Sequence, residues 1–308
     1  MTDLMSAVDD YLTVRRALGF KLSGYRRDLA AFVAYLQAAG APTVTTDLAL
    51  AWAKLPGADA HPAYLSRRLC VVRGFARHWQ AFDPATEVPP AQLLPHRSCR
   101  AVPFLYSAAD VAGLMTAARS LTPTLRGATY ETLIGSLVVT GARIGELIRL
   151  DRDDIDWDEG VLVVRNSKSK SRELPLHPST LDALDTYAQL RDKLCAASTS
   201  SFFVSAAGTR LVYVTVQYTF SRLTRLAGLQ PRSQQCRPRL HDTRHSFACG
   251  VLLGWYQAGV DVQVQLPLLS TYLGHSAPSD TYWYLSAVPE LLALASERRE
   301  KRTLAGRT

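Results

Sequence analysis

Residues 140–150 read T-G-A-R-I-G-E-L-I-R-L and directly follow the apolar segment Y-E-T-L-I-G-S-L-V-V at 130–139. A Thr-Gly pair separates the two stretches, so the second stretch is expected to begin a new helix. Its isoleucines and leucines recur at helical spacing and face the core. Arg143 and Glu146 are three residues apart and are expected together on another face of that helix. Taken alone, the two residues indicate no more than a surface ion pair.

A second polar stretch, L-H-D-T-R-H-S-F at 240–247, places His241 and His245 four residues apart. This spacing resembles the zinc motif H-E-x-x-H, but Asp242 stands where that motif has a glutamate, and no third ligand follows at a suitable distance. No metal site is therefore predicted. His241 and Arg244 lie one turn apart near a helix start, where donors and the helix dipole together favour an anion.

Two further motifs lie in a predicted hairpin and in the C-terminal region. Residues 160–176 read G-V-L-V-V-R-N-S-K-S-K-S-R-E-L-P-L, which predicts a strand at 161–164, a polar turn and a second short strand at 174–176. Lys168 and Lys170 fall in the turn. Residues 269–285 read L-S-T-Y-L-G-H-S-A-P-S-D-T-Y-W-Y-L, with a histidine after a Leu-Gly turn and a tyrosine nine residues later.

These motifs, in this order, resemble those of the tyrosine recombinase family, also called the phage integrase family. The resemblance covers roughly residues 104–299. It implies a DNA site-specific recombinase or integrase that cuts and rejoins strands through a 3′-phosphotyrosyl intermediate, without metal, ATP or another cofactor. The catalytic residues that it implies are Arg143, Lys168, His241, Arg244, His275 and Tyr284, with Glu146 in support.

Two of these assignments have competitors. Lys168 is preferred to Lys170 because it stands at the start of the turn, as the family lysine does, and Lys170 is expected to bind DNA. Tyr284 is preferred to Tyr282 because only Tyr284 lies nine residues after His275. His245 is expected either to pack within the helical core or to contact a catalytic group.

The N-terminal part predicts a helical domain over residues 1–95. Helical spacing is clear at 24–40 and at 62–79, and the second of these helices carries Arg73 and Arg77, which face either solvent or DNA phosphates. A proline-rich linker extends to about residue 103. This layout is similar to the family's core-binding domain, followed by a catalytic domain at 104–308. The fold class is thus mainly α with a small antiparallel β-sheet.

Composition agrees with a nucleic-acid partner. The 308 residues carry a formal net charge of +8, and the sequence pI is about 9.4. Five scattered cysteines with no C-x-x-C spacing, and the lack of an apolar leader or long apolar run, indicate a cytoplasmic protein without membrane attachment.

The resemblance also implies binding partners, and two alternative functions remain. The expected partners are double-stranded DNA, further copies of the chain in a tetramer on paired sites, and accessory proteins. The C-terminal tail would dock on a neighbouring copy or pack on its own domain. The ending is similar to integrases of mobile elements. The rival functions are DNA relaxation by a type IB topoisomerase and DNA binding by an accessory protein that has lost catalysis.

Overall fold

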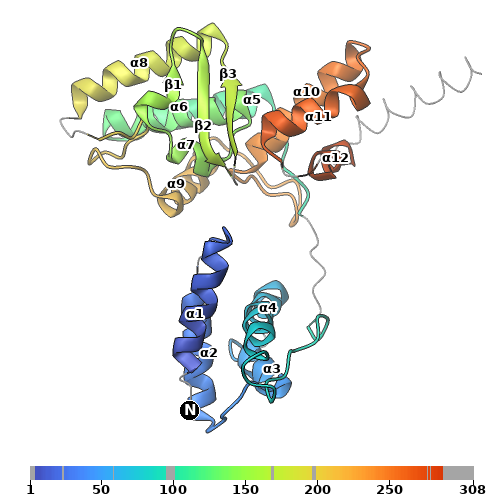
Figure 1. Cartoon of the computed structure of the whole chain (residues 1–308). Coiled ribbons are helices and arrows are strands. Elements are labelled where there is room, and N and C mark those ends of the chain that lie inside the picture. The colour runs from blue at the N-terminus through green and yellow to red at the C-terminus, as the bar shows by residue number, and fades with distance from the viewer. Residues whose placement is uncertain are drawn as a thin grey trace, which may run out of the picture. The chain divides into compact units, whose positions relative to one another are not determined.

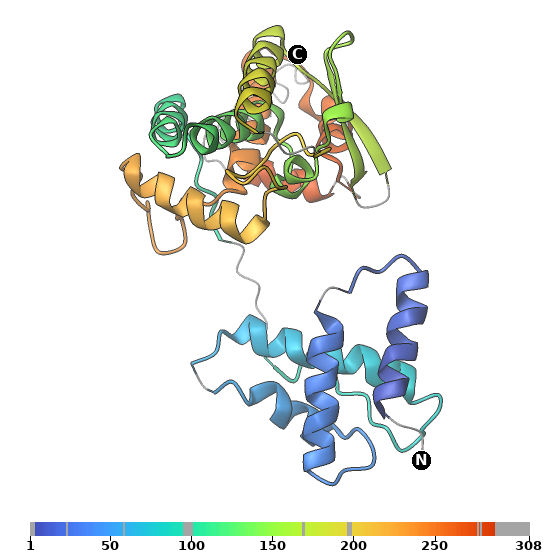
Figure 2. The ribbon, with the colours of Figure 1, turned by 90° about the vertical axis from the view of Figure 1, so that its left-hand side faces the viewer.

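The computed structural model describes residues 4–22, 24–57, 59–94, 101–167, 170–195, 199–275, 277 and 279–286. The chain divides into two compact units, Met1–Arg100 and Ala101–Thr308, each with a hydrophobic core of its own (Figures 1 and 2). The fold class predicted from the sequence is confirmed, since helices dominate and the strands form one small antiparallel sheet.

The first unit is helical. Its elements are α1 (Leu4–Ala17), α2 (Tyr25–Ala38), α3 (Thr46–Lys54) and α4 (Pro62–Trp79). The predicted helices at 24–40 and 62–79 are confirmed by α2 and α4. Helix α4 contacts the other three helices. It begins at a proline, whose missing N–H is no loss at a helix start. Leucine, valine and aromatic side chains from all four helices fill the core between them.

Arg73 of α4 lies against the proline-rich segment that follows the helix. Its Nε donates to the carbonyl of Pro89 at 2.7 Å, and its Nη2 donates to the carbonyl of Pro90 at 2.7 Å. Arg77 is exposed. Contact of either residue with DNA stays a prediction, and in this structure the guanidinium of Arg73 holds the backbone of the linker. Residues 95–100 of the predicted linker lie outside the described residues.

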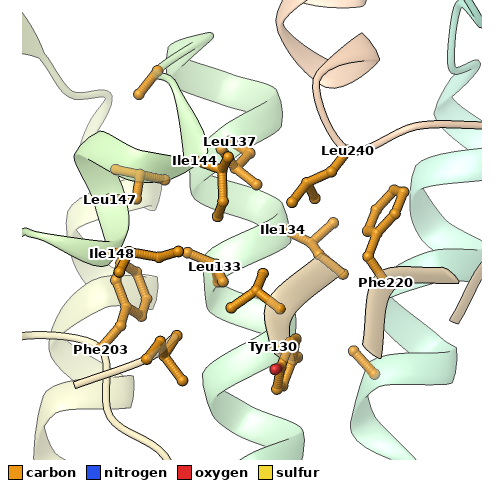
Figure 3. Packing of buried hydrophobic residues seen from close by; sticks show 14 of the residues in the cluster. Tyr130, Leu133, Ile134, Leu137, Ile144, Leu147, Ile148, Phe203, Phe220 and Leu240 are labelled. Atoms are coloured by element: carbon orange, nitrogen blue, oxygen red, sulfur yellow. The ribbon is translucent and has the colours of Figure 1, made fainter. Parts of the chain in front are cut away.

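The second unit is built around one central helix, α6. Its helices are α5 (Ala108–Arg119), α6 (Thr124–Thr140), α7 (Ile144–Ile148), the 3-10 turn η1 (Arg152–Asp154), α8 (Pro178–Leu194), α9 (Tyr213–Leu226), α10 (Asp242–Gln257), α11 (Val262–Leu273) and α12 (Ser279–Ser286). Helix α6 contacts α5, α7, α8 and α10. Figure 3 shows its Leu133, Ile134 and Leu137 among apolar side chains from α7 and α9. The apolar segment read from the sequence is therefore the centre of this core.

The sheet consists of β1 (Ile155–Asp156), β2 (Val161–Ser167) and β3 (Lys170–Pro175), antiparallel in the order β1-β2-β3. In the β2–β3 hairpin, Leu162 pairs with Leu174 and Val164 with Arg172. The sequence predicted strands only at 161–164 and 174–176. Both predictions are wrong in extent, because pairing extends β2 on to Ser167 and β3 back to Lys170, through residues whose polarity suggested a turn.

Helices α10, α11 and α12, drawn in orange to red in Figure 1, enclose a second hydrophobic core of this unit. Its buried members include Leu252, Leu269, Leu273 and Tyr284. Within the part of the chain that the structure describes, no helix is long and apolar enough to span a bilayer.

Candidate active site

The first arginine of the site stands where α6 ends. Gly141 terminates α6 with φ of 59°, a left-handed conformation that a glycine adopts without strain. Arg143 then forms the N-cap of α7. The Glu146 carboxylate accepts from the backbone N–H of Arg143 at 2.8 Å and from its Nη1 at 2.9 Å. The two residues that spacing placed on one face therefore form a local pair that fixes the arginine.

Three arginines converge on the turn that ends α11. The last carbonyls of a helix have no partner within the helix and carry the negative end of its dipole. Here three successive carbonyls of this kind each accept from a guanidinium. The pairs are Tyr272 with Arg172, Leu273 with Arg244, and Gly274 with Arg143. Elements far apart in sequence are thus joined at the residues just before His275.

Arg244 is held in the interior at the first turn of α10. Its side chain is 1% exposed, and its Nη1 donates to the carbonyl of Gly141 at 2.9 Å. Burial lowers the pKa of Arg244 to about 10, and the positive charge of Arg143 acts in the same direction. A hydrogen bond with Tyr284 opposes the shift. Arg244 remains a cation at neutral pH and lies beside both Arg143 and the tyrosine.

His241 is the N-cap of α10 and keeps only part of its surface in contact with solvent. Desolvation by surrounding atoms lowers the pKa of His241, followed by the charge of Arg244, so that the imidazole is neutral at pH 7. The adjacent Asp242 is buried, and Arg239 donates two hydrogen bonds, of 2.8 and 3.0 Å, to its carboxylate. Among the residues described, no three side chains of His, Cys, Asp or Glu are grouped to hold a metal ion.

Tyr284 of α12 lies among the histidines. Its ring stacks on that of His275, with centroids 5.9 Å apart, and meets the ring of His245 edge-on at 5.3 Å. The Nδ1 of His275 is 2.7 Å from the hydroxyl of Thr281. Tyr284 is 3% exposed, whereas the competing Tyr282 is 54% exposed. The structure therefore brings Tyr284, and not Tyr282, to Arg244 and His275.

In the sequence, both candidate lysines come within three residues after Ser167, the last residue of β2. Lys168 lies outside the described residues, and Lys170 is the first residue of β3. The structure places the hairpin beside the other site residues through Arg172, which binds both Glu146 and the end of α11. The choice between the two lysines stays a prediction.

Arg172 is the site residue that sequence reasoning missed. The signal for it was the alternation of β3, since Arg172 is two residues from the buried Leu174 and shares its face of the strand. Reading the whole segment as a polar turn concealed that alternation.

Known proteins resemble this chain in sequence and in fold. Residues 106–290 match the phage integrase family. A putative integrase/recombinase of Sinorhizobium fredii is 44% identical over 310 residues, which cover 98% of each chain. The Tn1549 transposon integrase in complex with transposon right-end DNA superposes with a TM-score of 0.67 at 17% identity, over 97% of this chain and 99% of that one. A lambda integrase tetramer bound to a Holliday junction gives a TM-score of 0.61 at 21% identity, over 91% of this chain and 76% of that one.

The chain therefore belongs to the phage integrase family, the tyrosine-type site-specific DNA recombinases.

Proposed function

We propose that this chain cuts and rejoins double-stranded DNA through a covalent 3′-phosphotyrosyl bond to Tyr284, in the service of a mobile element. The observation that carries the proposal is the meeting of Tyr284, Arg244, Arg143 and His275 at one helix end. A buried tyrosine beside two cations and an imidazole is suited to attack an anionic phosphodiester.

The two arginines stabilise the charge that develops in the transition state. The Tyr284 oxygen attacks phosphorus, and negative charge grows on the nonbridging oxygens. Guanidiniums bind such oxygens through paired hydrogen bonds. Arg143 and Arg244 are suited to this role because backbone carbonyls at the end of α11 fix both of them before the substrate arrives.

The proton movements fall to the histidines and the hairpin lysine. A neutral His241 is able to accept the proton that the tyrosine loses, and His275 adds a hydrogen bond next to the phenol ring. The bond from phosphorus to the 5′ oxygen then breaks. Lys168 is proposed to give that oxygen its proton, which yields a free 5′ hydroxyl. One phosphodiester replaces another, so the step needs neither ATP nor a metal ion.

The remaining parts of the proposal concern the whole chain. The helical first unit is proposed as a core-binding domain on DNA, and the second unit as the catalytic domain. Several copies would assemble on paired sites, as the lambda integrase tetramer does on a Holliday junction. The tail that would join copies, residues 287–308, lies outside the described residues. A cytoplasmic location fits the five scattered cysteines.

The test is to capture the intermediate on DNA that flanks the gene. Duplexes from these flanks are nicked just beyond each candidate position, so that a short 5′-hydroxyl fragment diffuses away after cleavage and the covalent complex persists. The proposal expects protein attached to the 3′ side and a released 5′ hydroxyl that a polynucleotide kinase labels. Attachment to a 5′ phosphate, or strand scission without covalent protein, would overturn it.

A further inference from the structure

A buried carboxylate lies between two arginines in the site. Glu146 has a side chain that is 1% exposed. Arg172 donates to it through Nη1 at 3.1 Å and Nη2 at 2.8 Å, and Arg143 donates through Nη1 at 2.9 Å. The Arg143 side chain is 23% exposed and that of Arg172 is 10% exposed. Arg143 is thus the more open of the two partners.

The charges of these three groups do not cancel. One carboxylate and two guanidiniums leave a net charge of +1. With Arg143 alone, Glu146 would form a neutral pair. The negative charge of Glu146 would then weaken the attraction between Arg143 and a phosphate. A buried carboxylate also requires strong compensation, which the two-pronged contact of Arg172 supplies.

Arg172 is placed by the fold rather than by a flexible contact. It stands opposite Val164 in the hairpin, and its Nε donates to the carbonyl of Tyr272 at 2.7 Å. A Cβ added at Gly274 would come within 2.8 Å of the Arg172 Nη1. The glycine before His275 therefore leaves the space in which this guanidinium packs.

We propose that Arg172 is a positioning residue that neutralises Glu146, so that Arg143 keeps a net positive charge for the scissile phosphate. Glu146 orients Arg143, and Arg172 removes the electrostatic disadvantage of using a carboxylate for that task. The inference rests on the proposed phosphoryl chemistry at Tyr284 and adds a residue to it.

The experiment compares cleavage by the full chain on two nicked substrates, one with the normal scissile phosphate and one with an uncharged methylphosphonate. Arg172→Met should cleave the phosphate about 10- to 100-fold more slowly than the wild type. Glu146→Gln in the same chain should restore most of the lost rate, because it removes the carboxylate charge that Arg172 no longer offsets. On the methylphosphonate, which needs less positive charge, the Arg172→Met defect should shrink to less than about threefold.

Two further variants separate charge from folding. Arg172→Lys keeps the positive charge and should remain close to the wild type, whereas Arg172→Gln keeps polar contacts without the charge and should behave as Arg172→Met does. If Arg172→Met does not fold, the comparison of Arg172→Lys with Arg172→Gln tests the inference in its place. Equal rates for the lysine and glutamine variants, or a double variant no faster than Arg172→Met alone, overturn the inference. A wild type that forms no covalent complex instead overturns the proposed function itself.

Discussion

The imidazole of His241 shows how one residue's surroundings set its chemistry. Four charged neighbours act on it: Arg244, Arg143 and Arg239 lower its pKa, and Asp242 raises it. Desolvation by the surrounding atoms lowers the pKa of His241 most, and the three arginines add to that effect against the opposing charge of Asp242. A neutral ring at pH 7 is what a proton acceptor for tyrosine requires.

The first prediction is that His241 titrates below its ordinary value of 6.5, as followed by the NMR signal of the ring. Because the pKa is lower in the folded chain than in the unfolded chain, the unfolded chain binds the additional proton. Stability from this group is complete above the unfolded pKa and is lost as the pH falls through the folded pKa. The urea unfolding free energy should therefore decline on acidification below pH 6.5 more in the wild type than in His241→Gln. A midpoint at or above 6.5 would contradict the assignment.

Site residues that lie in sequence motifs could be predicted from the sequence. Residues that only tertiary packing brings to the site could not. Arg143, Glu146, His241, Arg244, His275 and Tyr284 all lie in motifs with fixed spacing. Arg172 reaches Glu146 from a strand 26 positions away, and local spacing cannot reveal such a contact. The binding of Arg73 to linker carbonyls was likewise hidden, since exposed arginines and anchored arginines have the same pattern in a helix.

At the scale of elements, the β2–β3 hairpin carries the residue proposed to protonate the leaving group. Its two strands run up to Ser167 and from Lys170, so both strands are longer than the sequence suggested. Polar residues in a paired strand look like a turn because side-chain polarity reports solvent contact and not backbone pairing.

We predict that Lys168→Ala slows cleavage strongly and that a substrate with sulfur in place of the bridging 5′ oxygen restores the rate, because a thiolate leaves without a proton. Lys170→Ala is the matched control on the same hairpin and should show no selective rescue. Arg143→Ala should not be rescued either, since its role concerns nonbridging oxygens. Selective rescue of Lys170→Ala would transfer the role to that residue.

The break between α6 and α7 gives a prediction about stability. A Cβ at Gly141 would come within 2.4 Å of the Phe247 ring, and φ there is +59°. Gly141→Ala should lower the unfolding free energy by at least about 2 kcal/mol, from backbone strain of about 1–2 kcal/mol and overpacking of about 1–3 kcal/mol. Gly250→Ala in α10 is the control, with open space around the new methyl group. It should stabilise by up to about 1 kcal/mol. Equal effects of the two changes in chemical denaturation would refute this reading of the turn.

At the scale of the whole molecule, the sequence predicted the helical class and the small sheet, because apolar periodicity determines both. It did not predict that the second unit has two separate cores, one around α6 and one of α10, α11 and α12. That division arises from contacts between helices, which one-dimensional periodicity does not specify. The candidate active site lies at the end of α11, where the guanidiniums of Arg143 and Arg244 bind successive carbonyls.

The whole reaction is predicted to proceed without a metal ion, because guanidiniums supply the positive charge that metal ions provide in other phosphoryl-transfer sites. The yield of covalent complex should be unchanged, within about twofold, when the full chain is treated with EDTA before DNA is added. A chain stripped of metal that cleaves only after zinc or magnesium is restored would refute the arginine-based account.

The central claim is that Tyr284 forms the covalent bond to DNA. Tyr284→Phe should bind the nicked flanking DNA as the wild type does, yet give no covalent complex on a denaturing gel, because the attacking oxygen alone is removed. Tyr282→Phe, two residues away and exposed, should give the complex at the wild-type level. A covalent band that persists in Tyr284→Phe and disappears in Tyr282→Phe would contradict the account.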